Sequence, residues 1–451
     1  MSADDSDRVI LRLDASGEAL NLWQEYEYNS SFLVPSDGWS FTIGDDRLFD
    51  DWRNKLLPQT RVTLEINGRP QCAGRVDGWR INASRGGSGT TMTVFGRDML
   101  GQMVASHVDP LTLKFGAGQT LLDVVERVAK LYGFAVISTS PMTNRSIITG
   151  NNKRSTVVSK TESTTEVIDQ NTVDTKNVEG TTTVAIGVVT TEYDPTRPRD
   201  LKDSTLQQVE PHWGEGAFDF LARLCKRFGL WLWCDTLGRT LIVGQPDFDQ
   251  EPLYAITRRG TGGATYDNGA TLEVSAAEQP TVILAEGKVA KNPNYAKVQT
   301  RVAMINEFTG YDSAGNVIPA VQQILNAHQG VRTLPLRRNV FENAKYFGST
   351  EAVVALFLKD DESKSIEQLE GFVRKEMGVR QSNGIKYACV VDGHTQNGVV
   401  WGVDTTVMVD DQVTGASGVF WVKSRTFSKS RDDGTRTALE LVPAHCMEIG
   451  A

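Results

Sequence analysis

The sequence predicts a mainly β protein of the α+β type, in which two small β domains are separated by a mixed α/β domain. Short runs of alternating apolar and polar residues, broken by glycine-rich turns, fill the first ~110 residues and return near the C-terminus. Between them, two stretches follow the order helix, glycine, strand. The length of 451 residues suffices for about three domains.

The clearest N-terminal signal is a β-hairpin. The alternating run 61–66 ends at Asn67-Gly68, a pair that accepts positive φ angles and therefore favours a tight turn. Its partner strand is expected over 71–76. Two further strands are expected at 79–83 and 90–95, on either side of the polar loop 84–89. Several short strands with glycine-rich turns favour a sandwich or a small barrel.

Two helices of the middle region share one pattern. The first is expected to begin at the N-cap Thr120, with Asp123 three residues later, and to end at Gly133. The second carries an apolar stripe from Phe218 and ends at Gly229. A short apolar strand follows each glycine, so both stretches are typical of one mixed α/β domain.

A third helix precedes the C-terminal strands. Ile366, Leu369, Val373 and Met377 keep the helical period, and we expect Gly378 to end the helix. Strands are then expected at 387–391, 405–409, 419–428 and 435–442, with a hairpin turn at 431–434.

A segment of biased composition interrupts the middle region. Residues 135–192 contain no aromatic side chain, and 14 of the 37 positions from Ser155 to Thr191 are Ser or Thr. Such a segment can form β structure but has little to bury. We expect an inserted, exposed and mobile loop or hairpin.

Charge and composition exclude some classes of protein. The chain has 47 Lys and Arg against 56 Asp and Glu, a net charge of −9, which disfavours tight binding to a nucleic-acid backbone. No apolar run is long enough for a transmembrane helix, and the acidic N-terminus lacks the layout of a signal peptide, so we expect assembly in a cytoplasm. The five cysteines are scattered and are expected to be buried free thiols: Cys72, Cys225, Cys234, Cys389 and Cys446.

No pattern indicates an active site, so we predict no catalytic, cofactor-binding or metal-binding residues and no cofactor. The five histidines are too far apart in sequence for a zinc motif: His107, His212, His328, His394 and His445. The stretch 115–120 lacks the Gly-Lys-Ser/Thr ending of a phosphate-binding loop. The pairs Asp410-Asp411 and Asp432-Asp433 are expected in turns, where adjacent carboxylates do not converge.

The most site-like cluster is His212-Trp213-Gly214-Glu215. Its residue types suit acid–base chemistry, but the pattern is more typical of a turn that leads into a helix, with Glu215 favoured by the helix dipole. The nine tryptophans are more typical of a core than of a sugar-binding platform.

Three groups of motifs occur in a characteristic order. They are Gly74-Arg75-Val76-Asp77 with Phe95-Gly96-Arg97-Asp98, then 214–221 with 228–230 and 235–243, then 398–401 with 404–411, 422–427 and 434–443. Together, over roughly 350 residues, they resemble the baseplate hub proteins of contractile-tailed phages, specifically the Mu-like hub and tail-protein family.

This resemblance implies a fold of two related small β-barrel, tube-like domains and a mixed α/β domain. The implied divisions are 1–110 for the first barrel, 111–262 for the α/β domain with an insertion at about 139–205, 263–310 with 385–446 for the second barrel, and 311–384 for a connecting helical segment that packs with the α/β domain. Such hubs form homotrimers, and two similar barrels per subunit give a ring of pseudo-sixfold symmetry.

The resemblance also implies partners and a place in the virion. The ring would join the sixfold tail tube protein to the threefold central spike protein, with tape-measure and wedge or sheath-initiator proteins as further candidates. DNA would pass through the channel without specific binding, and no membrane anchor is implied. Because the chain is acidic, we expect the lumen to be net negative.

Two features depart from the family pattern and keep alternatives open. The insertion does not match, and no Arg-Tyr-Arg-Pro-like stretch is found, the nearest being Val331-Arg332-Thr333-Leu334-Pro335-Leu336. One alternative is the hub segment of a secretion-system spike, although such chains continue into an oligosaccharide-binding-type barrel and a β-helical needle, whereas this sequence ends at Ala451. The other is a tail-tip cell-wall hydrolase or carbohydrate binder, which would need two convergent carboxylates or an exposed tryptophan cleft.

Overall fold

A computed structural model provides the three-dimensional description of the chain. It describes residues 7–44, 46–83, 90–116, 119–140, 143, 153–160, 165–167, 177–178, 181–182, 188–193, 209–260, 269–275, 279–289, 298–312, 315–334, 353–430, 434–444 and 446–447.

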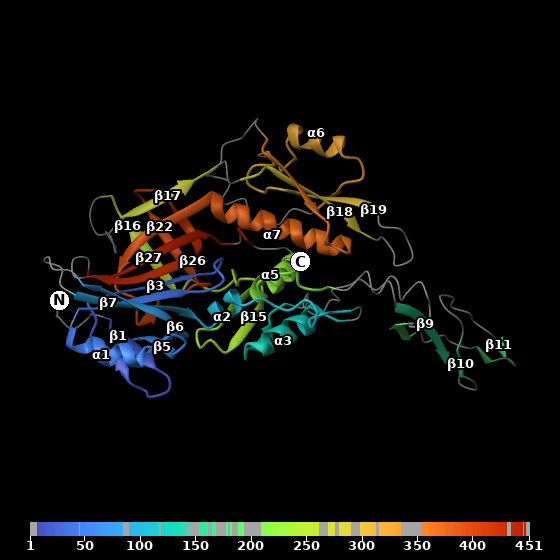
Figure 1. Ribbon diagram of the computed structural model, residues 1–451. Helices are drawn as coiled ribbons and strands as arrows, with labels where there is room; N and C mark the ends of the chain where they lie inside the picture. Colours follow the sequence, from blue (N-terminus) through green and yellow to red (C-terminus); the bar gives the residue numbers. More distant parts are fainter. Residues whose placement is uncertain are drawn as a thin grey trace.

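One large sheet of thirteen strands contains both ends of the chain (Figure 1). Its main path is β17 (Ala270–Val274), β22 (Ile385–Asp392), β27 (Gly434–Pro443), β26 (Ser417–Ser430), β3 (Glu25–Ser31), β4 (Gly38–Ile43), β7 (Thr90–Asp98), β6 (Arg69–Ala83), β5 (Arg61–Ile66), β1 (Val9–Leu13) and β2 (Ala19–Leu20). Off this path, β25 (Thr406–Asp411) pairs with β26, and β16 (Tyr254–Arg258) pairs with β25. The strands predicted for the two β domains are thereby confirmed, except that 71–76 and 79–83 belong to one continuous strand, β6. The β5–β6 turn is also confirmed, with positive φ at Asn67 and Gly68.

The two halves of this sheet share one strand order. The N-terminal half runs β3, β4, β7, β6, β5, β1, and the C-terminal half runs β17, β22, β27, β26, β25, β16. Each half has a long hairpin whose first strand carries a register shift: between Val76 and Gly78 in β6, and between Val422 and Ser424 in β26. One pairing differs, because β1 is antiparallel to β5 whereas β16 is parallel to β25.

The buried positions of the two halves also coincide. When the two bulges are aligned, the strand registers make β4 equivalent to β22 and β5 equivalent to β25. The buried residues that superpose are Trp39 with Tyr387, Phe41 with Cys389, Ile43 with Val391, Val62 with Val407, and Leu64 with Val409. The same topology with the same buried face indicates two related units.

The two halves join at β3 and β26. Tyr26–Ser31 of β3 pairs antiparallel with Ser424–Lys429 of β26, and one hydrophobic core draws on both halves. Two separate closed barrels, expected from the sequence, are absent from the described part of the chain. The reason is that the edge of β26 beyond β25 pairs with β3 instead of closing on its own half.

The mixed α/β region lies beside the large sheet, to its right in Figure 1, and below helix α7. It contains α2 (Leu100–Ala105), α3 (Leu121–Leu131), α5 (Ala217–Arg227), β8 (Ala135–Ser138), β14 (Trp231–Cys234) and β15 (Thr240–Gly244). Both predicted helices are confirmed, with the capping box of Thr120 and Asp123 and with positive φ at Gly133 and Gly229. Their apolar faces share a second core.

A further region is inserted between β17 and β22. It consists of β18 (Val282–Val289), β19 (Val298–Ile305), β20 (Arg332–Thr333), β21 (Ala355–Asp360), α6 (Pro319–Ala327) and α7 (Ile366–Gly384). The first four form their own sheet, and α7 packs beneath β18 and β19 (Figure 1). Of the segment 263–310, the large sheet therefore contains only β17 among the described residues.

Helix α7 does not end at Gly378, so that prediction is wrong. The helix continues to Gly384, and its glycines instead permit close packing. A Cβ at Gly371 would lie 2.3 Å from the carbonyl oxygen of Arg227, and one at Gly378 would lie 3.2 Å from the Cα of Met447. Apolar contacts hold the helix where its own sequence predicts a stop.

The remaining elements are short. They are α1 (Asp46–Lys55), β23 (Thr395–Gln396), β24 (Val399–Val400), β9 (Lys153–Lys160), β10 (Thr165–Val167), β11 (Asn177–Val178), β12 (Thr181–Thr182) and β13 (Val188–Tyr193). Strands β9, β10 and β13 form a small separate sheet within the Ser/Thr-rich segment. The predicted exposure and mobility of that segment lie outside the described residues. None of the described helices has the length and apolarity needed to cross a membrane.

The α5–α7 contact generates the first prediction. Replacing Gly371 by Ala adds a methyl group against the Arg227 carbonyl, so we expect the free energy of unfolding to fall by ~1–3 kcal/mol, even though Ala favours helix formation. Chemical denaturation measures the change. Gly38→Ala is the control, because a Cβ there meets no atom within 4 Å. Equal stability of the two variants would contradict the close contact.

Candidate functional site at the junction of the β regions

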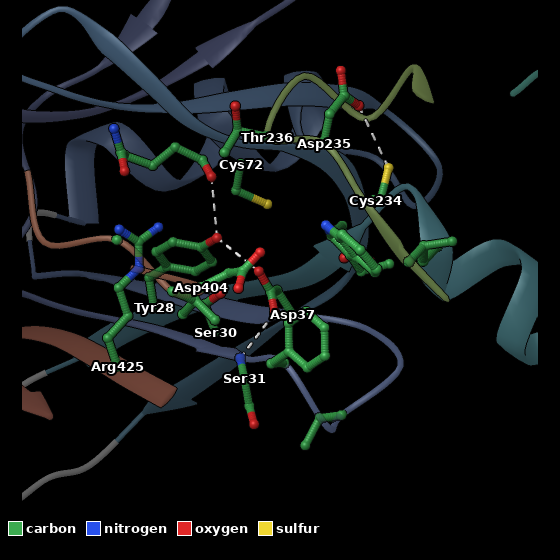
Figure 2. Close-up of a pocket in the computed structure, with 18 of the residues that line it drawn as sticks. Tyr28, Ser30, Ser31, Asp37, Cys72, Cys234, Asp235, Thr236, Asp404 and Arg425 are labelled. Carbon is green, nitrogen blue, oxygen red and sulfur yellow. Dashed lines mark hydrogen bonds between the residues drawn. The ribbon is translucent and has the colours of Figure 1, made fainter. Parts of the chain in front are cut away.

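A cavity of about 450 Å³ lies where the two β regions meet the α/β region (Figure 2). Its walls come from the β3–β4 segment, the start of β6, the β14–β15 hairpin and the loop after β24. Ten of its residues are labelled in Figure 2: Tyr28, Ser30, Ser31, Asp37, Cys72, Cys234, Asp235, Thr236, Asp404 and Arg425. Three regions of the chain thus share one pocket.

A buried tyrosine and a half-buried aspartate form the centre of the pocket. The Tyr28 hydroxyl donates to the Asp37 carboxylate at 2.9 Å and lies 3.1 Å from the carbonyl oxygen of Gln71. The backbone N–H of Ser31 donates to the other Asp37 oxygen at 3.3 Å. Burial raises the pKa of both Asp37 and Tyr28. These bonds fix the turn between β3 and β4 against β6.

Two further half-buried aspartates fix neighbouring turns. Asp98 accepts hydrogen bonds from Ser36 Oγ at 2.6 Å and from the Gly101 N–H at 3.1 Å. Asp404 accepts from Trp421 Nε1 at 2.9 Å. Burial raises the pKa of Asp98 to about 7, with repulsion from Asp37 as a second cause, and burial raises the pKa of Asp404 to about 6.

A buried arginine connects the pocket to the β3–β26 junction. Arg425 donates to the carbonyl oxygen of Trp401, and its guanidinium lies 4.5 Å from the ring centre of Phe427 and 5.6 Å from that of Tyr28. Because Tyr28 belongs to β3 and Arg425 to β26, this stacking reinforces the backbone pairing of the two strands.

Burial and hydrogen bonding limit the reactions that the side chains of the pocket can carry out. Burial raises the pKa of the Cys72 and Cys234 thiols, so both stay protonated at neutral pH and are poor nucleophiles. The carboxyl groups of Asp37, Asp98 and Asp404 hold turns together. Within the described ranges, no three His, Cys, Asp or Glu residues are placed to bind a metal ion. The arrangement suits a structural junction.

The cluster at 212–215 is a turn leading into a helix, as the sequence suggested. Glu215 lies just before α5 and accepts from Arg223 Nε at 2.6 Å and from the His212 N–H at 2.8 Å. Burial opposes its ionisation, but these bonds lower the pKa of Glu215 below its usual value. Arg223 also pairs with Glu362 at 2.6 Å, which ties α5 to the turn before α7.

The adjacent carboxylates do not converge. Asp411 is buried and accepts from the Tyr387 hydroxyl and the Val413 N–H, whereas Asp410 pairs with Arg259 at 2.7 Å. The pair 432–433 lies outside the described residues. Of the tryptophans, Trp213 is exposed, and the other eight are buried or half-buried: Trp23, Trp39, Trp52, Trp79, Trp231, Trp233, Trp401 and Trp421. The five cysteines are free thiols, four buried and Cys234 half-buried.

Sequence reasoning missed the junction pocket. Its aspartates are separated by up to ~370 residues, and each alone resembles an ordinary turn residue. The one local signal is Pro35-Ser36-Asp37-Gly38, a typical turn sequence. It predicts a turn but not the partial burial of Asp37.

Two family models match the chain, one on each β region. Residues 10–98 match the N-terminal domain of the Mu phage baseplate assembly protein GpP-like family, and residues 381–443 match the C-terminal domain of NMB1110-like tail proteins. The first match spans β1 to β7 and the second spans β22 to β27. Each β region of the chain thus resembles a domain of phage baseplate and tail proteins.

Solved structures of two tail proteins share the fold of this chain. The tail protein of Neisseria meningitidis MC58 is 18% identical, with a TM-score of 0.61 over 97% of this chain and 96% of that chain. The 43 kDa tail protein of prophage MuSo2 from Shewanella oneidensis is 15% identical, with a TM-score of 0.61 over 98% of this chain and 99% of that chain. No curated protein matches the sequence. Both matched domain families are described as phage tail or baseplate proteins.

The half-buried Asp98 generates a prediction on pH dependence. Because its pKa is raised from 3.8 to about 7, the folded protein keeps a proton that the unfolded chain releases, so this residue lowers stability as pH rises from about 4 to 7. Asp98→Asn removes the effect. We expect its free energy of unfolding, relative to the wild type, to increase by ~2 kcal/mol between pH 5 and pH 8. Denaturation at both pH values with the exposed Asp14→Asn as control provides the measurement, and a constant difference would contradict it.

The Glu215 network generates a second prediction. Glu215→Gln deprives Arg223 of a charged acceptor, so we expect a loss of ~1–2 kcal/mol in the free energy of unfolding. The exposed Glu210→Gln is the matched control. Peptidoglycan zymograms of the wild type and of Glu215→Gln should both show no clearing. Clearing by the wild type that disappears in the variant would favour a tail-tip hydrolase instead.

Proposed function

We propose that this protein is a structural, non-enzymatic hub of the phage baseplate, which assembles as a homotrimeric ring between the tail tube and the central spike. The observation that carries the proposal is the repeated strand order of the large sheet. Two related β units per subunit become six in a trimer, which gives a ring with pseudo-sixfold symmetry.

The number of copies of the other regions supports a threefold binding face on the ring. The α/β region and the β18–β21 region with α7 occur once per chain, so a trimer carries three copies of each. A surface that is present twice per chain suits a sixfold partner, and a surface that is present once suits a threefold partner. We therefore assign the tail tube protein to the β units and the spike protein to the single-copy regions.

The remaining partners follow the same logic. Tape-measure and wedge or sheath-initiator proteins are further candidates, with the Ser/Thr-rich insertion as a single-copy element. DNA passes through the ring without specific binding, because a net charge of −9 per chain opposes retention of a phosphate backbone.

The domain organisation is part of the proposal. It comprises a first β unit at 1–110, the α/β domain at 111–262 with its insertion at about 139–205, a second β unit in 263–310 and 385–446, and the connecting segment 311–384 with α7. Two groups of strands cross these bounds, because β16 joins the second β unit, and β18 and β19 form a separate sheet with β20 and β21. The family matches on 10–98 and 381–443 and the repeated strand order support the separation into two β units.

Light scattering of the purified full-length chain tests the ring. We expect about three times the chain mass of 49.6 kDa, and negative-stain averages of the same peak should show a ring with a central hole and three- or apparent sixfold symmetry. The symmetry arises because each subunit supplies two equivalent β units. A compact monomer of about 50 kDa at every concentration, without rings in the micrographs, would contradict the trimer.

A further inference from the structure

We propose that the outer edge of β6 beyond its bulge binds the outer edge of β17 of a second copy of this chain, as an added antiparallel strand pair. The inference deepens the proposed ring, on which it rests for the number of copies, by assigning its subunit interface. It follows from the repeat inside the chain, in which one of two equivalent strand edges is occupied.

The occupied edge is the contact between β26 and β3. Before its bulge, β26 pairs with β25 through Ser417–Trp421, and beyond the bulge Ser424–Lys429 pairs with β3 on the same side. The bulge thus lets one strand pair first within its own unit and then with the next unit. Phe427 faces Tyr28 in this contact, and both side chains are buried.

The equivalent edge of the N-terminal unit is not paired with any of the described strands. Strand β6 pairs with β5 through Arg69–Arg75, and beyond its bulge at Asp77 the described strands leave residues 78–83 paired only with β7. The equivalent of β3 is β17, which among the described strands pairs only with β22. One chain therefore presents both halves of a contact that it already makes once internally.

The internal contact fixes the register of the proposed one. When the two bulges are aligned, residues 78–83 of β6 are equivalent to residues 424–429 of β26. The pairing of β3 with β4 and of β17 with β22 then makes Leu272 the equivalent of Tyr28. The resulting cross-subunit pairs are Trp79 with Val274, Arg80 with Glu273, Ile81 with Leu272, Asn82 with Thr271, and Ala83 with Ala270.

These pairs are complementary, although only the backbone registers were used to derive them. On the outer face an arginine meets a glutamate, and on the inner face Ile81 meets Leu272. Arg80 and Glu273 are both exposed in the single chain, so they are accessible to each other. Opposite charges and apolar pairs directly across two strands each stabilise a sheet.

The apolar side chains at these edges are less buried than their internal counterparts. Trp79, Ile81 and Leu272 are half-buried against the main core, and Val274 is 39% exposed. The internal counterparts Phe427 and Tyr28 are 0% and 1% exposed. A second copy would bury the remaining apolar surface and satisfy the backbone groups of both edges.

The two edges differ, so the contact is head-to-tail. Each chain gives its β6 edge to one neighbour and its β17 edge to the other, and such contacts close into a ring when the rotation permits. In a ring of three copies, three β26–β3 contacts within chains alternate with three β6–β17 contacts between chains. The ring then consists of six equivalent β units.

Charge reversal tests the outer pair. Arg80→Glu and Glu273→Arg each place like charges opposite one another, so we expect the trimer dissociation constant, measured by light scattering over a dilution series, to rise about tenfold or more. The double variant R80E/E273R restores the pair and should recover most of the affinity. Unchanged circular dichroism and melting temperature establish that the exposed substitutions leave the fold intact. If the wild type forms trimers and neither single reversal raises the trimer dissociation constant, the proposed interface is wrong, whereas the proposed hub function is unaffected.

Disulfide trapping tests the register independently. The double variant R80C/E273C, oxidised in the full-length protein, should give covalent trimers on a non-reducing gel. The control R80C/L272C is shifted by one residue, which places the two thiols on opposite faces of the sheet, and should give none. Equal cross-linking of both variants, or none in either, would overturn the strand pairing. A ladder of dimers and longer chains with the R80C/E273C variant alone would support the pairing but contradict the threefold ring.

Discussion

The backbone pairing between β3 and β26 is the contact on which the rest of the structure depends. It connects strands that lie about 400 residues apart in sequence, and it converts two β units into one sheet with one hydrophobic core. Because an edge strand exposes unpaired N–H and C=O groups, the pairing also removes a site of aggregation in each unit. Arg425 reinforces it by stacking on Phe427 and Tyr28, and the junction pocket with its half-buried aspartates lies directly beside it. The raised pKa values of those aspartates are a cost of placing turns from three regions at one point.

The bulges explain the family motifs in physical terms. In the Gly74-Arg75-Val76-Asp77 motif, Asp77 is the extra residue of the β6 bulge, and its carboxylate accepts from Arg97 Nε at 2.6 Å, a residue of the second motif on β7. In the C-terminal unit the extra residue is Lys423, which pairs with Glu440 of β27 at 2.7 Å. Each bulge is thus held by an ion pair across its own hairpin, with the charges reversed. A bulge fixed in this way sets where the strand leaves its own sheet and becomes available to the next unit.

The sequence predicted the features that depend on neighbouring residues. Alternation and Asn67-Gly68 located the β5–β6 hairpin, and Thr120 with Asp123 located the start of α3, because these signals act within a few residues. Strand β3 (Glu25–Ser31) was missed, because only tertiary pairing makes this polar strand stable; its partner β26 was predicted, but their pairing was not. Gly378 was assigned as a helix end because a local signal does not reveal that Met447 packs against it. The pocket could not be predicted for the same reason, because Asp37, Asp98 and Asp404 meet only in the folded chain.

A hub between a sixfold and a threefold partner faces a mismatch that cannot be solved by a protein with one binding surface per subunit. Duplicating a β unit within one chain solves it, provided that the internal contact and the contact between chains have the same geometry. The equivalent bulges of β6 and β26 meet that condition at the level of the backbone, whereas the side chains of the two edges differ. The internal contact buries Phe427 against Tyr28 within the main core, whereas the edges of β6 and β17 carry the exposed Arg80 and Glu273. Charged residues on an edge strand oppose unspecific edge-to-edge pairing, so in the proposed ring they would favour pairing with the one edge that carries the opposite charge.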